Sequence, residues 1–380
     1  MVDGTGGATG AGGAGDGPDA AAPDAGDPPG TGPRGLHVVG NHIEDAAGKT
    51  VVLRGVNRSG TEYMCIQNRG FFEGPSDAAS LQAIVAWKAN AVRVPLNESC
   101  WLAINGAPAA YAGENYKAAI RGYVALLHAH GLVPILDLHW SAPGALQATR
   151  LQPMPDADHA PAFWSDVAAT FADDDGVVFE PYNEPYPSNN QDSNAAWACW
   201  RDGCTATTAP AGATPATYQA VGVQALVSAI RDAGAHNLIL LGGVQFSDTL
   251  TQWLAFKPAD PLPTPNLGAT WHAYNFNACV TQACWDGAPA TVAAAVPLVA
   301  TEFGQRDCQS TFVVPLMQWL DAHAAGYLAW AWDAYGPCAP YVSRTQPGNP
   351  FSLIGPASGD YSGSPNVGYG QAIFDHLTAL

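Results

Sequence analysis

The amino-acid sequence predicts an α/β fold, a (β/α)8 TIM barrel, from three observations. Short apolar segments alternate with segments whose apolar residues recur at helical spacing, and this alternation indicates a parallel sheet. Eight strand segments can be counted, which is the number that closes a barrel. An open doubly wound sheet would carry a Gly-rich first turn, whereas the first strand here runs into Arg54-Gly55-Val56-Asn57-Arg58-Ser59-Gly60.

The elements are expected in the following order. Residues 1–34 are low-complexity Gly, Ala, Asp and Pro, typical of a flexible, disordered linker, and residues 35–380 are expected to form one (β/α)8 domain. Leu36 to Glu44 and Thr50 to Val56 flank Asp45 to Lys49 and predict an N-terminal β-hairpin. The barrel strands are expected near residues 51, 91, 133, 177, 237, 269, 298 and 327, with helices over 79–89, 116–130, 162–172, 218–233, 311–325 and 369–380.

Composition narrows the classes of partner. The formal net charge is −18 and only 13% of the residues are charged, which argues against nucleic acid and anionic lipid as partners. No run of about 18 apolar residues is present, so no membrane span is expected. No signal peptide follows Met1, and a secreted, cell-surface or periplasmic protein would have lost it. We expect a monomer.

The eight cysteines indicate disulfides and an oxidising compartment. Cys199 with Cys204 and Cys279 with Cys284 are close in sequence, although eight cysteines allow 105 connectivities. A zinc site is the alternative, but no pair has Cys-x-x-Cys spacing. The run 173–175 of three Asp residues is expected to be a solvated turn rather than a calcium site. We therefore expect no metal and no cofactor.

Polar residues stand at the ends of the predicted strands, and these ends meet at one face of a barrel. One such residue has an ordinary structural explanation, but six strand ends of this kind indicate an active site. They are Arg93 on the second strand, Asp137 and His139 on the third, Asn183 and Glu184 on the fourth, His272 and Tyr274 on the sixth, Glu302 on the seventh and Asp333 on the eighth.

Two carboxylates, Glu184 and Glu302, are the expected chemical centre. The chain contains no G-x-S-x-G nucleophile elbow and no phosphate loop. Paired Glu residues with aromatic neighbours suit cleavage of a glycosidic bond, in which one carboxyl donates a proton and the other is ionised. Arg93 and Tyr274 can hold Glu302 charged. Glu180 is expected to be a buried structural acid.

Taken together, these residues resemble glycoside hydrolase family 5, the cellulase family of retaining (β/α)8 glycosidases in clan A. The resemblance covers residues 36–380, and Asn-Glu-Pro alone would be a weak motif. The set that carries it is Arg93 in Val-Arg-Val-Pro, His139 in Leu-His-Trp, Asn183-Glu184-Pro185, His272-Ala-Tyr274, Glu302-Phe-Gly304 and Trp332.

The resemblance implies roles for these positions. Glu184 would be the general acid/base and Glu302 the nucleophile. The sugar at the cleavage site, in the −1 subsite, would be bound by Asn183 through its 2-hydroxyl and by His139 and His272, with Trp332 stacked beneath it and Trp330 as the second choice. Arg93 and Tyr274 would support Glu302.

The implied enzyme is a secreted retaining β-glycoside hydrolase, with an oligo- or polysaccharide as its partner. An endo-β-1,4-glucanase is the first expectation. A β-mannanase, a xylanase and an exo-acting β-glycosidase stay open, because the long loops 141–161 and 185–215 depart from compact cellulases. A barrel that binds carbohydrate without cleaving it is the alternative from another class.

Overall fold

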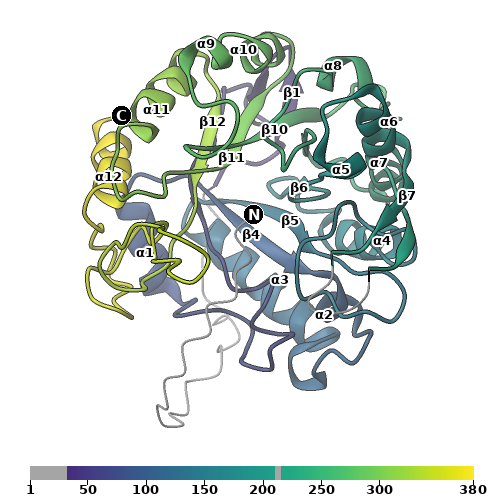
Figure 1. Ribbon diagram of the computed structural model, residues 1–380, viewed down its shortest axis with the longest axis horizontal. Coiled ribbons are helices and arrows are strands. Elements are labelled where there is room, and N and C mark those ends of the chain that lie inside the picture. Colours follow the sequence, from purple (N-terminus) through teal and green to yellow (C-terminus); the bar gives the residue numbers. More distant parts are fainter. Residues whose placement is uncertain (1–31, 210–214) are drawn as a thin grey trace.

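The structure, a computed structural model, describes residues 32–209 and 215–380 and confirms the (β/α)8 class. Eight parallel strands close a barrel in the order β10-β11-β12-β3-β4-β5-β6-β9 (Figure 1). These strands are β3 (Arg54–Asn57), β4 (Ala91–Asn97), β5 (Val133–Trp140), β6 (Val178–Glu180), β9 (Ile239–Gly242), β10 (Leu267–Tyr274), β11 (Leu298–Gly304) and β12 (Gly326–Ala329). The linker expected over residues 1–34 lies outside the described residues as far as residue 31.

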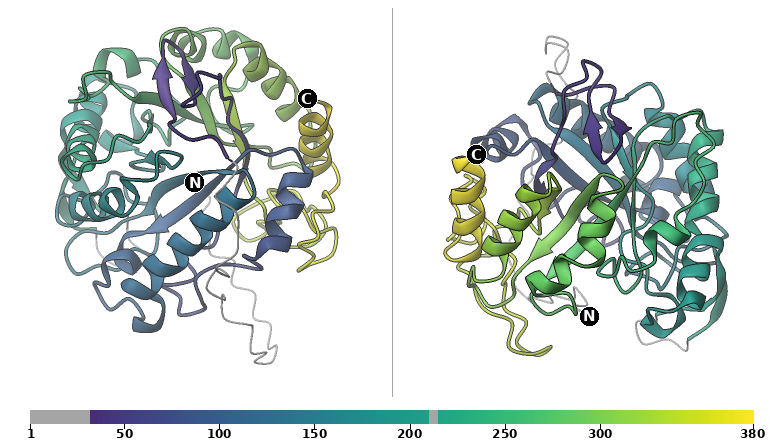
Figure 2. Two further views of the ribbon diagram at one scale, coloured as in Figure 1. Left: turned by 180° about the vertical axis from the view of Figure 1, so that it is seen from behind. Right: turned by 90° about the horizontal axis from the view of Figure 1, so that it is seen from above.

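Helices surround the barrel, as the two further views in Figure 2 show. The larger ones are α1 (Ala78–Ala86), α3 (Glu114–Ala129), α4 (Ala160–Phe171), α6 (Asn194–Asp202), α7 (Val223–Asp232), α11 (Val313–Ala322) and α12 (Tyr369–Ala379). Shorter helical segments are α2 (Glu98–Leu102), η1 (Ala109–Tyr111), α5 (Pro187–Asn190), α8 (Trp253–Phe256), α9 (Gln282–Trp285) and α10 (Ala288–Ala293). The main apolar core fills the space between the helices and the barrel.

The N-terminal hairpin turns earlier than expected. Strands β1 (His37–Val39) and β2 (His42–Glu44) pair around Gly40, whose φ of +61° suits a glycine. Residues 45–49 form a second turn, after which Thr50 bridges back to Glu44. The expected turn at 45–49 is therefore present, closed by this antiparallel bridge, while the paired strands β1 and β2 meet one turn earlier. The hairpin lies over the barrel end opposite the active-site loops, where a second apolar cluster closes the barrel (Figure 2).

The expected helix over residues 218–233 begins later than predicted. Strands β7 (Cys204–Thr207) and β8 (Thr217–Ala220) form a hairpin before α7 starts at Val223. Tyr218 is held in this hairpin because its hydroxyl donates to the Met154 carbonyl at 2.6 Å. A tertiary contact thus overrides the helical pattern of the sequence.

Four disulfides tie the connections together. Cys199–Cys204 and Cys279–Cys284 are the pairs suggested by proximity, and Cys65–Cys100 and Cys308–Cys338 complete the set. Cys65–Cys100 joins the loop after β3 to helix α2. Among the described residues, no helix is long and apolar enough to cross a membrane.

Candidate active site

The carboxyl ends of the barrel strands bring their polar side chains around Arg93, at the centre of strand β4. Arg93 is fully buried, and its guanidinium donates to Glu302 at 2.7 Å, to Glu180 at 2.8 and 3.1 Å and to Asn183 at 2.8 Å. It also lies 3.2 Å from Asp137. One buried cation is therefore shared by three carboxylates from three strands, which fixes their relative positions.

Glu302 lies on strand β11 and is held from two directions. Arg93 Nη1 donates to its Oε1 at 2.7 Å, and the Tyr274 hydroxyl donates to its Oε2 at 2.6 Å. Glu302 is almost fully buried, with 4% of its surface exposed. Two donors of this kind favour the ionised carboxylate and orient it.

Glu184 follows strand β6 and is the more open of the two carboxylates, with a side chain 22% exposed. Its Oε1 lies 3.0 Å from His272 Nδ1, and the same nitrogen lies 3.6 Å from Oε2 of Glu302. One oxygen of Glu184 and one oxygen of Glu302 lie within 4.8 Å of each other. The two acids therefore face the same small volume at the barrel mouth.

His272 lies between the two acids, on strand β10. Burial disfavours its charged form, but the carboxylates of Glu302, Glu180 and Glu184 outweigh this effect and raise the pKa of His272 to about 10. The imidazolium can then donate through Nδ1 to Glu184 and through Nε2 to Thr301 Oγ1, which lies 3.2 Å away. A charged His272 offsets part of the negative charge that Arg93 alone cannot neutralise.

His139 lies on the other side of the site, at the end of β5. Its Nδ1 is 2.9 Å from Asp137 Oδ2, so Asp137 orients the ring. Burial opposes its charge, but Asp137 and then Glu62 raise the pKa of His139. The ring stacks on Trp330, with centroids 5.4 Å apart and an angle of 9° between the planes. His139 Nε2 is 3.5 Å from the Asn183 amide, which links it to the Arg93 network.

Trp332 does not form a platform at the barrel mouth. It is fully buried and packs edge-on against Trp87, with centroids 4.9 Å apart. Strand β12 ends at Ala329, so strand alternation does not extend to Trp330 and Trp332. Trp330 is half-buried beside His139, and the peptide bond that follows it is cis. The expectation for Trp332 is therefore corrected in favour of Trp330.

Glu180 is the last residue of the fourth barrel strand, β6. Glu180 is fully buried and binds Arg93, as expected of a structural acid. The strand ends there, and Tyr182 turns away to donate its hydroxyl to the Gln152 carbonyl at 2.8 Å. Tyr182 therefore belongs to the loop packing and not to the catalytic face.

Glu62 is a site residue that the strand pattern missed, because it stands in the loop after β3 and not at a strand end. It is 3% exposed, and its Oε2 accepts from the Gly60 amide at 2.7 Å. Burial raises the pKa of Glu62 to about 7, although His139 opposes this shift. The carbonyl of Glu62 accepts from Asn97 at 2.6 Å and fixes the loop. The Cys65–Cys100 pair was the sequence feature that could have indicated an ordered loop here.

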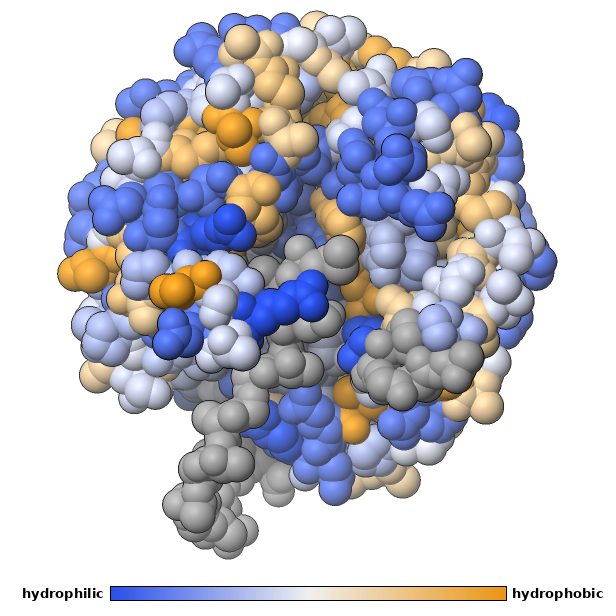
Figure 3. All heavy atoms as spheres, viewed as in Figure 1, coloured by the Kyte–Doolittle hydropathy of each residue, from blue (hydrophilic) through white to orange (hydrophobic). Residues whose placement is uncertain are grey.

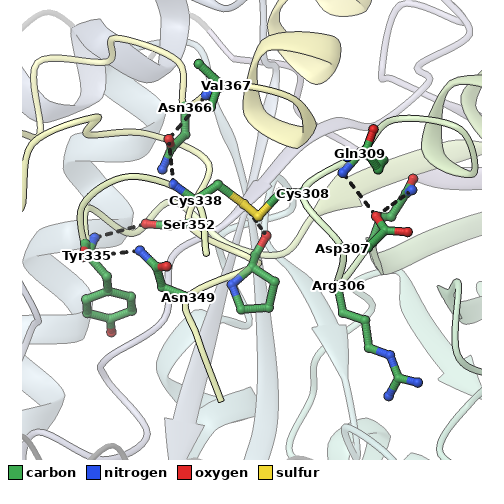
Figure 4. The surroundings of a disulfide bond; sticks show 12 residues. Arg306, Asp307, Cys308, Gln309, Tyr335, Cys338, Asn349, Ser352, Asn366 and Val367 are labelled. Carbon is green, nitrogen blue, oxygen red and sulfur yellow. Dashed lines mark hydrogen bonds between the residues drawn. A yellow bond between two sulfur atoms is a disulfide. The ribbon is translucent and has the colours of Figure 1, made fainter. Parts of the chain in front are cut away.

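A disulfide shapes the rim beside Glu302. Cys308 follows β11 and Cys338 follows β12, so the bond joins the two loops, as Figure 4 shows. Asn366 accepts from the Cys338 amide at 3.1 Å, and Ser352 accepts from the Tyr335 amide at 2.9 Å. These ties hold the exposed ring of Tyr335 at the rim. The face that bears these loops is hollowed near its centre (Figure 3).

Two groups of side chains in the described residues have the spacing of metal ligands. One is the set Glu184, His272 and Glu302 itself. The other is Glu98 of α2 with Asp156 and His159 of the loop after β5. Burial and mutual repulsion raise the pKa of Glu98, and burial raises that of Asp156. These raised pKa values favour a protonated carboxyl, which could donate to the other and pair their unpaired oxygens.

Comparison with known proteins finds relatives in sequence and in fold. A mannan endo-1,4-β-mannosidase from Streptomyces lividans is 25% identical over 328 residues, which is 84% of this chain and 71% of the relative. A β-glucanase from Saccharophagus degradans has the same fold, with a TM-score of 0.64, 17% identity and coverage of 96% of this chain and 98% of that chain. A β-mannanase from Streptomyces thermolilacinus also has this fold, with a TM-score of 0.59, 22% identity and coverage of 92% of this chain and 97% of that chain.

A family model settles the assignment that the likeness in fold leaves open. The model of the cellulases, glycosyl hydrolase family 5, matches residues 44–336. This match spans most of the chain and includes both Glu184 and Glu302. The chain therefore belongs to glycoside hydrolase family 5.

Proposed function

We propose that this family 5 glycoside hydrolase is a retaining endo-β-1,4-glycanase that acts by double displacement. The observation that carries the proposal is the short distance, within 4.8 Å, between oxygens of Glu184 and Glu302. Carboxyl groups about 5–5.5 Å apart are typical of retaining enzymes, whereas inverting enzymes leave about 6.5–9.5 Å for a water molecule. A separation near 9 Å would have excluded this mechanism.

In the first step, Glu302 attacks the anomeric carbon and Glu184 donates a proton to the leaving oxygen. Arg93 and Tyr274 support this assignment, because both donate to Glu302 and favour its ionised form. Glu184 is the more exposed acid, as suits a group that exchanges protons with substrate and water. Asn183, which Arg93 holds in position, is proposed to bind the 2-hydroxyl of the sugar.

In the second step, Glu184 removes a proton from water, and the water oxygen attacks the anomeric carbon as the bond to Glu302 breaks. His272 donates to Glu184 and supports the carboxylate that forms when the proton leaves. His139 and Trp330 are proposed to line the −1 subsite on the opposite side. The net configuration of the sugar is retained because each step inverts it once.

Two backbones are equal candidates for the substrate. β-1,4-Glucan is the first expectation from the sequence, and the β-glucanase neighbour has the same fold. β-1,4-Mannan is supported by the mannosidase from Streptomyces lividans. A panel of soluble glucan, mannan and xylan with sizing of the products separates the backbones and separates endo from exo cleavage.

The proposal also concerns the compartment in which the enzyme acts. Four disulfides support an oxidising, extracellular location. We propose that residues 35–380 are the catalytic domain of a secreted or surface-attached enzyme. Activity that persists after the linker is removed would support this boundary.

Azide tests the two roles directly. Glu302→Ala with an activated β-glycoside should be rescued by azide and yield the α-glycosyl azide, because only one inversion occurs. Glu184→Ala should yield the β-glycosyl azide, because the covalent intermediate still forms. Glu114→Ala, on the exposed surface of α3, is the matched control and should keep full activity. The same anomer from both variants would overturn the assignment, and binding without release of reducing ends would favour a non-catalytic barrel.

A further inference from the structure

A pair of aromatic side chains lies beside Glu184 and has no role in the chemistry above. Tyr186 follows Glu184 by two positions, and Phe246 lies in the connection after β9. Their rings stack with centroids 4.5 Å apart and 28° between the planes. Both residues are half-buried, so the pair presents apolar surface at the catalytic face.

The backbone at Phe246 is in a conformation that bulky residues rarely adopt. Gln245, Phe246 and Ser247 have φ values of +56°, +62° and +58°. Such residues persist where the surrounding structure fixes them, and they gather at functional sites. A glycine would fit this turn with less strain, so the presence of a phenylalanine indicates that its ring is used.

The turn over residues 245–247 is hydrogen-bonded to the residues just before and just after Glu184. The Phe246 amide donates to the Pro185 carbonyl at 3.1 Å, and the Ser247 hydroxyl donates to the Asn183 carbonyl at 2.9 Å. The Ser247 carbonyl accepts from the His272 amide at 2.9 Å. The ring of Phe246 is therefore held in a fixed position relative to Glu184.

A second left-handed segment supports the first. Ser188, Asn189 and Asn190 have φ values of +53°, +57° and +61°. Gln245 Nε2 donates to the Asn190 carbonyl at 3.0 Å, which joins the two segments. Both loops that carry the aromatic pair are thus tied to each other.

We propose that Phe246, backed by Tyr186, is the platform for the leaving-group sugar and for an acceptor sugar in the second step. The inference rests on the proposed role of Glu184. Because Glu184 protonates the leaving oxygen, the leaving sugar extends past Glu184, away from Glu302. The apolar face of a pyranose ring packs on the face of an aromatic ring. A ring fixed beside Glu184 meets this sugar.

The test compares substrates with and without a sugar leaving group. Phe246→Ala is assayed on a β-1,4-linked hexasaccharide and on a dinitrophenyl β-glycoside of the matching disaccharide. We expect kcat/KM to fall by about 10-fold on the hexasaccharide, the scale of losing a central aromatic contact. On the aryl glycoside it should change by less than about 2-fold, because the leaving group is not a sugar.

Two further variants complete the experiment. Phe246→Tyr keeps the ring and should restore hexasaccharide cleavage. Phe256→Ala, a half-buried phenylalanine near Trp197 and Arg201, is the size-matched control and should behave as wild type. Transfer to an added disaccharide acceptor should fall in Phe246→Ala alone. An equal loss on both substrates, or no loss on either, would overturn the platform. A wild-type protein that cleaves neither substrate would instead overturn the proposed function.

Discussion

Replacement of Arg93 by Met removes the cation on which the site depends. Asp137, Glu180 and Glu302 lie 3.2, 2.8 and 2.7 Å from its guanidinium, and all four side chains are 5% exposed or less. Without Arg93, three buried carboxylates face His272 and His139 alone. Breaking a buried ion pair by removing one partner costs about 3–5 kcal/mol, so Arg93→Met should be strongly destabilised.

The expected shift in melting temperature follows from the size of the folded chain. Unfolding entropy is about 2.1 cal/mol/K per residue, or about 0.7 kcal/mol/K for about 350 residues. A loss of about 3–5 kcal/mol therefore lowers Tm by about 4–7 °C. Activity should fall by about 10²–10³-fold, because Glu302 loses a preorganised donor. Calorimetry and kcat/KM on an aryl glycoside measure the two effects.

The loss of stability in Arg93→Met should depend on pH. Burial raises the pKa of Glu180, but Arg93 and then His272 outweigh burial, so its pKa is lowered in the folded protein. A lowered pKa stabilises the fold above the ordinary value of about 4.3, and this stability is lost as pH falls below it. The gap in Tm between wild type and Arg93→Met should therefore be wider at pH 7 than at pH 4.

Arg121→Met is the control for this experiment. Arg121 pairs with Glu114 on the exposed face of α3, and its side chain is 42% exposed. An exposed pair contributes little, so this variant should melt within about 1 °C of wild type. If Arg93→Met also melts within about 1 °C and keeps its activity, the buried network does not have the role assigned to it.

Three other variants test separate parts of the site. Tyr274→Phe removes one hydrogen bond to Glu302 and should lower kcat/KM about 100-fold with an unchanged Tm; a change below about 3-fold would show that this hydroxyl is dispensable. Trp330→Ala removes the ring that stacks on His139 and should raise KM for oligosaccharides, whereas an unchanged KM would exclude it from the −1 subsite. Glu98→Gln removes one acid of the pair with Asp156, whose pKa values are raised mainly by burial. A carboxyl with a raised pKa lowers the stability of the fold as pH rises above about 4. Glu98→Gln should therefore have a higher Tm than wild type at pH 8 but not at pH 4. An equal shift in Tm at both pH values would contradict a proton shared by the two acids.

The sequence predicted the parts of the site that follow from strand periodicity. Arg93, Glu302 and Tyr274 lie on strands β4, β11 and β10, whose carboxyl ends meet at the barrel mouth, although the register of β11 shifts between Ala300 and Phe303. Each of these side chains contacts another member of the predicted set. The barrel itself was predictable for the same reason, because eight parallel strands have few other ways to bury their apolar faces.

Periodicity gave wrong or incomplete answers where strands end. Trp332 shares its parity with Trp330, but both lie beyond the last residue of β12, and the chain there packs Trp332 against Trp87. Glu62 and Phe246 lie in loops and reach the site through contacts with Asn97 and Pro185, which are 35 and 61 positions away in the chain. No local pattern encodes such contacts. Their positions depend on tertiary hydrogen bonds that satisfy buried backbone groups, so the two facing carboxylates could be predicted from the sequence while the proposed sugar platform could not.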